Sequence, residues 1–193
     1  MYRITDVVKN LIFINAIIFL ALQLPLFEAY RHYFILYPVD STAFRPVQLV
    51  THMFMHGNMG HLFFNMLALF FFGPNVESIW GPKKFLFFYL FCGVGAMVLH
   101  ILLGGNSSVV GASGAITGVL IAFASLFPNA QVMLLIPPIP MKAKYLVLII
   151  LGIDLFFGLS HSSTGIAHFA HLGGALFGFL LIQYWKKSGS MYH

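Results

Sequence analysis

The chain has 193 residues, of which 60% are hydrophobic and 8% are charged, and its formal net charge is +5. A soluble domain carries about 25% charged residues, so a chain with this few cannot cover its surface with polar groups. The composition therefore excludes an ordinary soluble domain and predicts a protein for which lipid is much of the solvent. Basic residues that flank apolar segments explain the positive charge better than nucleic-acid binding, which we do not expect.

Six apolar segments follow one another along the chain. A spanning helix needs about 17–25 apolar residues, and these runs are continuous rather than alternating, which favours helices over strands. The sequence therefore predicts an all-α membrane protein, a bundle of six transmembrane helices that forms a single domain over residues 1–193. The predicted spans are 10–27, 57–73, 85–103, 112–127, 145–159 and 166–185.

The first segment has the outline of a signal peptide. No small-residue cleavage site follows it, and more spanning segments come after, so we expect this helix to be retained. Proline and glycine mark the later connections at 73–84, 102–111 and 127–140. The longest connection, residues 28–56, is too apolar for a free linker, and we expect it to fold partly into the outer leaflet.

Lys and Arg predict the orientation of this bundle. Six crossings place both termini on one side, and cytoplasmic loops carry an excess of basic residues. With cytoplasmic termini, only Arg31 and Arg45 lie outside. The inside then holds Arg3, Lys9, Lys83, Lys84, Lys142, Lys144, Lys186 and Lys187. This asymmetry favours cytoplasmic termini.

A few polar side chains interrupt the apolar segments. Such residues are costly in lipid and are functional candidates. They are His61, Asn65, Ser113, Thr117, Asp154, His168 and His171. In the predicted orientation the second, fourth and sixth segments run inward from the outer face. At about 1.5 Å per residue, His61, Ser113 and His171 then differ in depth by only several ångströms, so we expect them to meet in one layer.

Glycines supply a means of contact between the fourth and sixth segments. Gly111, Gly114 and Gly118 line one, and Gly174 and Gly178 line the other. Small residues spaced in this way let helices approach closely in membranes. Packing through them would bring the hydroxyl of the fourth segment near the last histidine of the sixth. Ordinary small-residue packing explains the same pattern.

Three motifs together resemble the signatures of rhomboid intramembrane serine proteases. They are GASG at 111–114, HGNMGHLFFN at 56–65 and AHLGGALFG at 170–178. Their order and the six-helix count are similar to the minimal bacterial-type core of that family. The resemblance implies a multi-pass protein of the bacterial inner membrane. It also implies an enzyme whose partners are membrane lipid and transmembrane protein substrates, cut near their extracytoplasmic ends.

The resemblance also implies roles for particular residues. Ser113 is the nucleophile and His171 its base, a dyad without the carboxylate of soluble triads, so packing must orient the imidazole. The backbone N–H of Ser113, with His61 and Asn65, forms the oxyanion hole. The residues implied to line the substrate cavity are Gly111, Gly114, His56, Thr117 and His168.

The sequence departs from the family pattern at several positions. Thr117 stands where an aromatic residue often packs against the catalytic histidine, and Val47 and Gln48 stand where Trp-Arg is common. We interpret Asp154 as a polar contact with water or a neighbouring helix rather than a third catalytic residue. Glu77 is expected to tie the cytoplasmic loop in place.

Three alternatives stay open. His52 and His56 are four residues apart, a spacing that suits a metal site, but no Asp, Glu or Cys accompanies them, so we expect neither a metal nor another cofactor. A non-catalytic relative that binds membrane clients would keep the fold and lose Ser113 or His171. A small transporter would continue its polar residues to the cytoplasmic side, where these segments are apolar.

Overall fold

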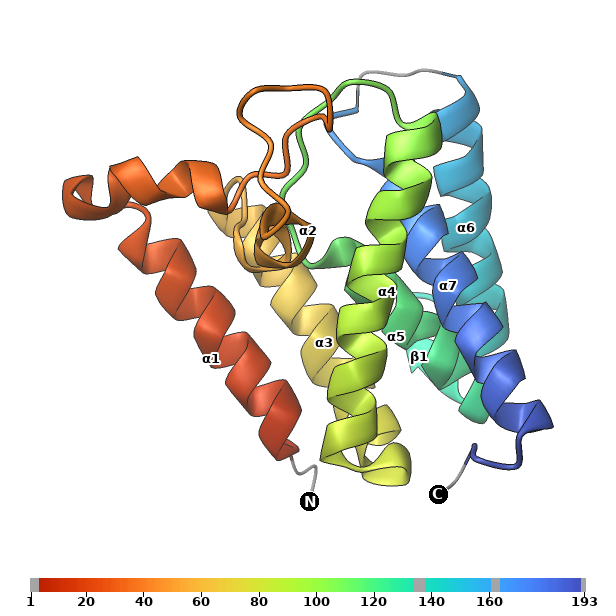
Figure 1. Cartoon of the computed structure of the whole chain (residues 1–193). Coiled ribbons are helices and arrows are strands. Elements are labelled where there is room, and N and C mark those ends of the chain that lie inside the picture. Colours follow the sequence, from red (N-terminus) through yellow and green to blue (C-terminus); the bar gives the residue numbers. More distant parts are fainter. Residues whose placement is uncertain (1–3, 134–137, 161–163, 192–193) are drawn as a thin grey trace.

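Six long helices build the computed structural model, which describes residues 4–133, 138–160 and 164–191. The long helices are α1 (Asp6–Ala21), α3 (Met59–Trp80), α4 (Pro82–Leu103), α5 (Ser113–Leu126), α6 (Ala143–Leu159) and α7 (His168–Lys187). The short elements are η1 (Pro25–Tyr33), α2 (Gln48–Thr51), η2 (His52–Phe54), β1 (Gln131–Met133) and β2 (Pro140–Lys142). The chain is mostly helical, and both of its ends lie at the same end of the bundle (Figure 1).

Two of these helices meet the length and composition of a membrane span. They are α3 and α4, each of 22 residues, while α5 is a shorter apolar helix. Their outward surfaces are apolar: Phe63, Phe64 and Phe87 are more than half exposed. The structure thus agrees with an apolar helical protein, and the sixfold crossing stays a prediction.

Two predicted boundaries are wrong. The first helix ends at Ala21 rather than residue 27, because Leu24 is extended before Pro25 begins η1. The connection predicted at 73–84 is helical as far as Trp80, since α3 runs through Pro74 and breaks only at Gly81, whose φ is 75°. Local propensity disfavours proline inside a helix, but tertiary packing holds this one in place.

The connection between α5 and α6 contains a short hairpin where we expected no strands. β1 pairs antiparallel with β2, and Val132 lies opposite Met141. Three-residue strands are too short for an alternating pattern to be read from the sequence. Residues 134–137, in the connection between the two strands, lie outside the described part of the chain.

Glu77 fastens the start of α1 to the end of α3. Its carboxylate accepts hydrogen bonds from the hydroxyl of Thr5 and from the backbone N–H groups of Val7 and Val8, the last two at 3.1 and 2.9 Å. These amides have no partner within α1, and the helix dipole favours a negative charge at this end. Glu77 thus has a structural role, but it lies within α3 and fastens α1 rather than the loop that we expected it to tie.

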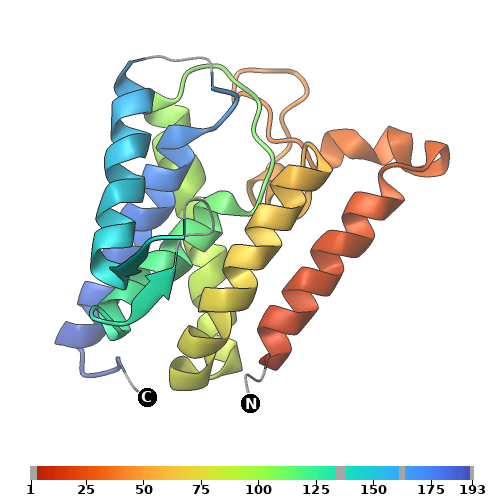
Figure 2. The same cartoon turned by 180° about the vertical axis from the view of Figure 1, so that it is seen from behind.

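α5 forms the centre of the bundle. Every residue from Gly114 to Phe123 is buried, and α3, α4 and α7 surround the helix (Figures 1 and 2). The chain after α4 descends from the end of the bundle into its middle before α5 begins (Figure 2). At 14 residues α5 is about 21 Å long, less than the roughly 30 Å of a hydrocarbon core, so its first residue begins below the bundle's surface.

Candidate active site

Ser113 is the first residue of α5. Its backbone N–H therefore belongs to the first turn, where amides lack intrahelical partners. Thr117, one turn later, donates its hydroxyl hydrogen to the Ser113 carbonyl at 2.8 Å and is 5% exposed. The Thr117 hydroxyl thus donates to a carbonyl of its own helix.

α5 and α7 pack through the glycines of the two motifs, as predicted. A Cβ added at Gly114 would lie 3.3 Å from the Ala170 carbonyl oxygen, and one added at Gly174 would overlap the Gly114 carbonyl. Gly114 and Ala170 are the immediate neighbours of Ser113 and His171, so the two candidate catalytic residues lie next to a close contact between α5 and α7. Although both are described, no hydrogen bond joins their side chains. Catalytic hydrogen bonds are often long before substrate binds.

The His171 ring has a carboxylate partner. Its Nδ1 lies 3.0 Å from Asp154 Oδ1 and 3.2 Å from Oδ2. Asp154 comes from α6 and is 4% exposed. We expected packing to orient this ring, and that expectation is incomplete because a buried acceptor also holds it. The predicted contact of Asp154 with a neighbouring helix is present.

His168 shares the same carboxylate. Its Nδ1 lies 2.7 Å from Asp154 Oδ1, and its Nε2 lies 2.7 Å from the Thr164 hydroxyl. The ring stacks on Phe157 of α6 with centroids 5.6 Å apart. It meets the His171 ring edge-on at 6.4 Å. His168 is therefore buried between α6 and α7, beside the candidate base.

His61 lies against the segment that precedes Ser113. Gly111 has φ 123°, a conformation that suits glycine, and a Cβ there would lie 2.7 Å from Cε1 and Nε2 of His61. Asn65 behaves differently, because its amide donates to the His61 carbonyl at 2.9 Å. The His61 ring therefore lies against Gly111, two residues before Ser113, while the Asn65 side chain is bonded to its own helix.

His52 and His56 lie in the connection before α3. The His52 carbonyl accepts from the Gly111 N–H at 2.8 Å, which ties this connection to the segment before Ser113. Burial lowers the pKa of His52 to about 4. Burial, and to a smaller extent nearby His61, lowers the pKa of His56 to about 4. Both rings are therefore neutral at pH 7. They do not share a helical face, because η2 ends at Phe54.

Gln48 holds together the long connection at residues 28–56. The sequence did not predict how this connection folds, because Val47 and Gln48 stand where Trp-Arg is common in the family. Its side chain is fully buried and donates to the carbonyls of His32 and Ala43 at 2.9 and 3.0 Å. Its carbonyl oxygen accepts from the Arg45 N–H at 3.0 Å. The amide thus joins several turns of the connection, and Val47 beside it is 50% exposed.

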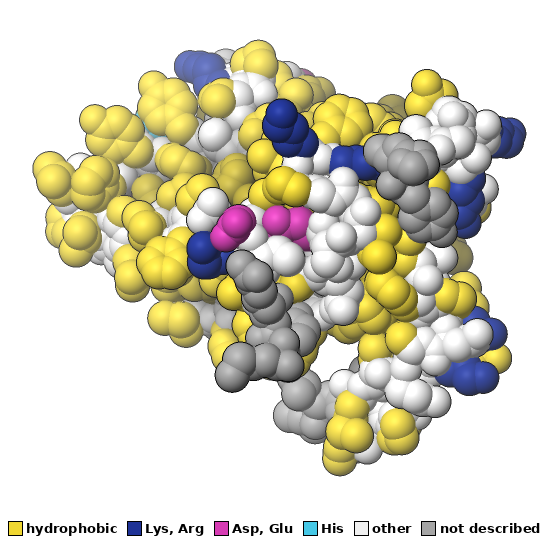
Figure 3. Space-filling view, turned by 90° about the horizontal axis from the view of Figure 1, so that it is seen from below, with side chains coloured by type: hydrophobic (Ala, Val, Ile, Leu, Met, Phe, Trp, Pro, Cys, Tyr) yellow, Lys and Arg dark blue, Asp and Glu magenta, His cyan; other side chains and the backbone are white. Residues whose placement is uncertain are grey.

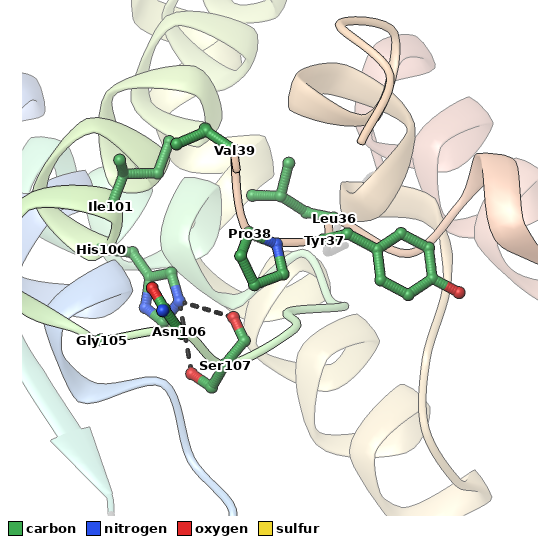
Figure 4. Close-up of a pocket in the computed structure, with 9 residues that line it drawn as sticks. All are labelled: Leu36, Tyr37, Pro38, Val39, His100, Ile101, Gly105, Asn106 and Ser107. Carbon is green, nitrogen blue, oxygen red and sulfur yellow. Dashed lines mark hydrogen bonds between the residues drawn. The ribbon is translucent and has the colours of Figure 1, made fainter. Parts of the chain in front are cut away.

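A small cavity lies at a distance from these residues, between the connection after η1 and the end of α4 (Figure 4). His100 points into it, and its Nε2 lies 3.2 Å from the Ser107 carbonyl. Its described lining includes none of the candidate catalytic residues. The cavity is therefore not the candidate active site.

The fold and these contacts define a helical membrane protein with Ser113 and His171 on two closely packed central helices. A family model described as Rhomboid domain matches residues 43–187. Presenilin-associated rhomboid-like protein A, mitochondrial, of Danio rerio is 30% identical over 93% of this chain and 49% of its own length. Rhomboid protein 1, mitochondrial, of Saccharomyces cerevisiae is 29% identical over 93% of the chain and 54% of its own. The chain belongs to the rhomboid family.

The relatives bear on the predicted location. The chain spans about half the length of the curated relatives it matches. RHOMBOID-like protein 6, mitochondrial, of Arabidopsis thaliana is 34% identical over 69% of this chain and 42% of its own length. All three relatives have mitochondrial names, so they do not support the bacterial inner membrane that we expected.

Proposed function

We propose that the chain is an intramembrane serine endopeptidase that cuts the transmembrane segments of membrane proteins near their extracytoplasmic ends. The observation that supports the proposal is the contact of Gly114 with the Ala170 carbonyl, since these residues are the immediate neighbours of Ser113 and His171. Membership of the rhomboid family supports the same reaction class. The family alone does not distinguish an enzyme from a client-binding relative, and the retained serine and histidine favour the enzyme.

The proposed reaction runs through an acyl-enzyme. The Ser113 hydroxyl attacks the scissile carbonyl carbon while His171 Nε2 takes the hydroxyl proton. When the C–N bond breaks, His171 passes this proton to the leaving amine, and Ser113 stays esterified to the new carboxyl end. A water molecule, deprotonated by the same imidazole, then hydrolyses the ester and restores the serine.

The developing oxyanion needs donors close to Ser113. The free backbone N–H at the start of α5 is one, because it lies at the positive end of the helix dipole. The His61 ring, which lies against Gly111, is placed to supply a second. Asn65 would have to release its bond to the His61 carbonyl in order to take part.

We further propose that the chain crosses the membrane six times with both termini on the cytoplasmic side. Lys and Arg side chains are spread over the end of the bundle at which the termini lie (Figure 3). Cytoplasmic loops of membrane proteins carry an excess of Lys and Arg, so this end is expected on the cytoplasmic side. Leu148, Phe156 and Leu159 of α6 are about two-thirds exposed, so this helix presents an apolar surface to lipid and to a substrate helix.

Cleavage of a generic single-pass membrane substrate in detergent tests the proposal. Wild type, Ser113→Ala and His171→Ala are compared at equal folded concentration. We expect both variants to lose turnover by about 10⁴-fold or more. Ser125→Ala, at the other end of α5, is the matched control and should retain wild-type turnover.

A fluorophosphonate probe separates the enzyme from a non-catalytic relative. The proposal predicts covalent labelling of the wild type at Ser113 and no labelling of Ser113→Ala. Cleavage that survives in purified Ser113→Ala would contradict the mechanism. A folded wild type that neither cleaves nor reacts would instead favour a client-binding protein.

A further inference from the structure

Asp154 is a charged residue in an apolar helix, where a charge is unusual. It belongs to α6, a helix of 17 residues whose other buried members are Ala143, Leu146, Val147 and Gly158. A buried carboxylate in such surroundings is costly unless hydrogen-bond donors surround it. The donors here are two imidazoles of α7, at 2.7 Å for His168 and 3.0 Å for His171.

We propose that Asp154 is a positioning residue that holds the His171 imidazole with Nδ1 protonated and Nε2 turned toward Ser113. This inference rests on the proposed function. It adds to the two-residue mechanism a carboxylate from α6 that does not touch the substrate. Asp154 acts through His171, so its effect appears in the rate of the chemical step.

The hydrogen-bond inventory fixes the tautomer. An ionised carboxylate only accepts, so the ring nitrogen that faces it must donate. A neutral His171 that donates from Nδ1 carries its lone pair on Nε2, which is the form that can take a proton from a serine hydroxyl. Both Asp154 oxygens lie within 3.2 Å of Nδ1, so the carboxylate also opposes rotation of the ring.

His168 completes the arrangement from the other side. It donates from Nδ1 to the same carboxylate oxygen, which leaves its Nε2 to accept the hydroxyl hydrogen of Thr164. The ring is fixed by its stacking on Phe157. From Thr164 through His168 and Asp154 to Nδ1 of His171, each polar atom thus has a partner with neutral rings and an ionised carboxylate, and Nε2 of His171 is left to accept a proton. His168 positions Asp154 as Asp154 positions His171.

Thr117 stands where the family often has an aromatic residue, and this difference explains why a carboxylate is needed to orient His171. An aromatic residue at that position would pack against the catalytic histidine, but Thr117 directs its hydroxyl to the Ser113 carbonyl. Within the described residues, the ring packed against His171 is that of His168, edge-on. The carboxylate therefore takes over the orientation that an aromatic neighbour would provide.

A purely structural link between α6 and α7 is the competing explanation, and spectroscopy separates the two without any change to Asp154. ¹⁵N-histidine labelling of the wild type in detergent distinguishes protonated from unprotonated ring nitrogens, and His171→Ala assigns the signal. We expect the Nδ1–H form of His171 at pH 7. The Nε2–H form would overturn the proposal.

Kinetics supply the second test. In Asp154→Asn we expect kcat to fall by up to about 10⁴-fold, the loss known for removal of the tautomer-fixing carboxylate of a soluble triad, with KM within about threefold of wild type. The rate of fluorophosphonate labelling at Ser113 should fall in parallel, because it needs no transmembrane substrate. Asp154→Glu, which keeps the charge, should recover part of the loss.

The control is Gly158→Ala. An added Cβ there would press on Phe169 at 3.3 Å and would lie at an ordinary contact distance of 3.5 Å from His168 Cβ, so it should disturb the contact between α6 and α7 without touching the carboxylate. It should lower the melting temperature and leave kcat per folded molecule near wild type. An active wild type with an equally active Asp154→Asn would overturn the inference alone. A wild type that neither cleaves nor labels would overturn the proposed function instead.

Discussion

The molecule buries a carboxylate near each end of the bundle, and the two differ in the groups that donate to them. Glu77, at the end that holds the termini, is 4% exposed and accepts from a threonine hydroxyl and two backbone amides of α1. None of these donors titrates near neutral pH. Nearby, Trp80 packs edge-on against Trp185 with centroids 5.1 Å apart, so this end is fixed by rigid apolar and backbone contacts.

Asp154 is equally buried, but both of its donors are imidazoles. Each ring has a second nitrogen that is not bonded to the carboxylate: that of His168 lies 2.7 Å from the Thr164 hydroxyl, and that of His171 is the atom we propose to face Ser113. A carboxylate bonded to backbone amides holds a helix in place, whereas one bonded to imidazoles also selects their protonation. The comparison predicts that substitutions at the Glu77 end change stability, and that those at the Asp154 end change the rate as well.

The largest effect outside the catalytic residues and Asp154 is expected at Gly174. A methyl group there would overlap the Gly114 carbonyl, and backbone cannot yield as a flexible side chain can. Gly174→Ala should separate α5 from α7 and lower kcat/KM by about 10²-fold, the cost of roughly 1 Å of misplacement. Gly152→Ala, where nothing lies within 4 Å, is the control and should be neutral in the same cleavage assay. Equal loss in the two variants would show that the glycine contact does not position the site.

The second effect is a loss of stability in acid. His52 and His56 titrate near 4 in the folded protein and near 6.5 when unfolded. Below pH 6.5 the unfolded chain binds protons that the folded chain does not, so stability falls until about pH 4. Each ring accounts for roughly 3 kcal/mol at most.

Thermal unfolding in detergent between pH 7.5 and 4.5 measures this loss. His56→Gln is the informative variant, since it removes one of the two titrating rings. It should flatten the dependence relative to wild type. An unchanged slope in that variant would assign the acid sensitivity to other groups.

The third effect contrasts with that of Asp154→Asn. Glu77→Gln removes a charge-assisted cap from α1 and should lower the free energy of unfolding by about 1–3 kcal/mol. Turnover per folded molecule should stay at the wild-type value, because the residue is remote from Ser113. Thermal unfolding checks the expected loss of stability, and the cleavage assay checks the unchanged turnover. Glu28→Gln, at an exposed position, is the control. A fall in kcat as large as that of Asp154→Asn would erase the distinction between the two carboxylates.

Much of the helical fold follows from the sequence, because long apolar runs are a strong signal. The errors lie where tertiary packing overrides a local sequence preference. Pro74 stays inside α3 although proline disfavours helix interiors, and Gly73 before it fits closely against Val8 of α1. The hairpin of β1 and β2 is missed because its strands are three residues long.

The site shows the same division. Ser113 and His171 are predictable from motifs and from glycine spacing, whereas the partner of Asp154 is not, because it depends on how α6 and α7 are rotated about their axes. One signal was available. Asp154 lies five residues before the end of α6 and His171 three residues after the start of α7, so antiparallel neighbours would place them at similar depth. Depth alone leaves open whether their side chains face one another.

The smallest effect is expected at Thr117. Thr117→Val keeps the shape of the side chain and removes only the hydroxyl that donates to the Ser113 carbonyl at 2.8 Å. That bond lies within one helix, so its loss should change the free energy of unfolding by about 1 kcal/mol or less and kcat by less than about threefold. The double variant Thr117→Val with Asp154→Asn, assayed for cleavage, sharpens the point. If Asp154 alone orients the imidazole, the two effects should be additive in free energy, because the residues share no partner. A double variant much slower than the product of the single effects would mean that α5 also holds the ring, and the carboxylate would then be one support among two.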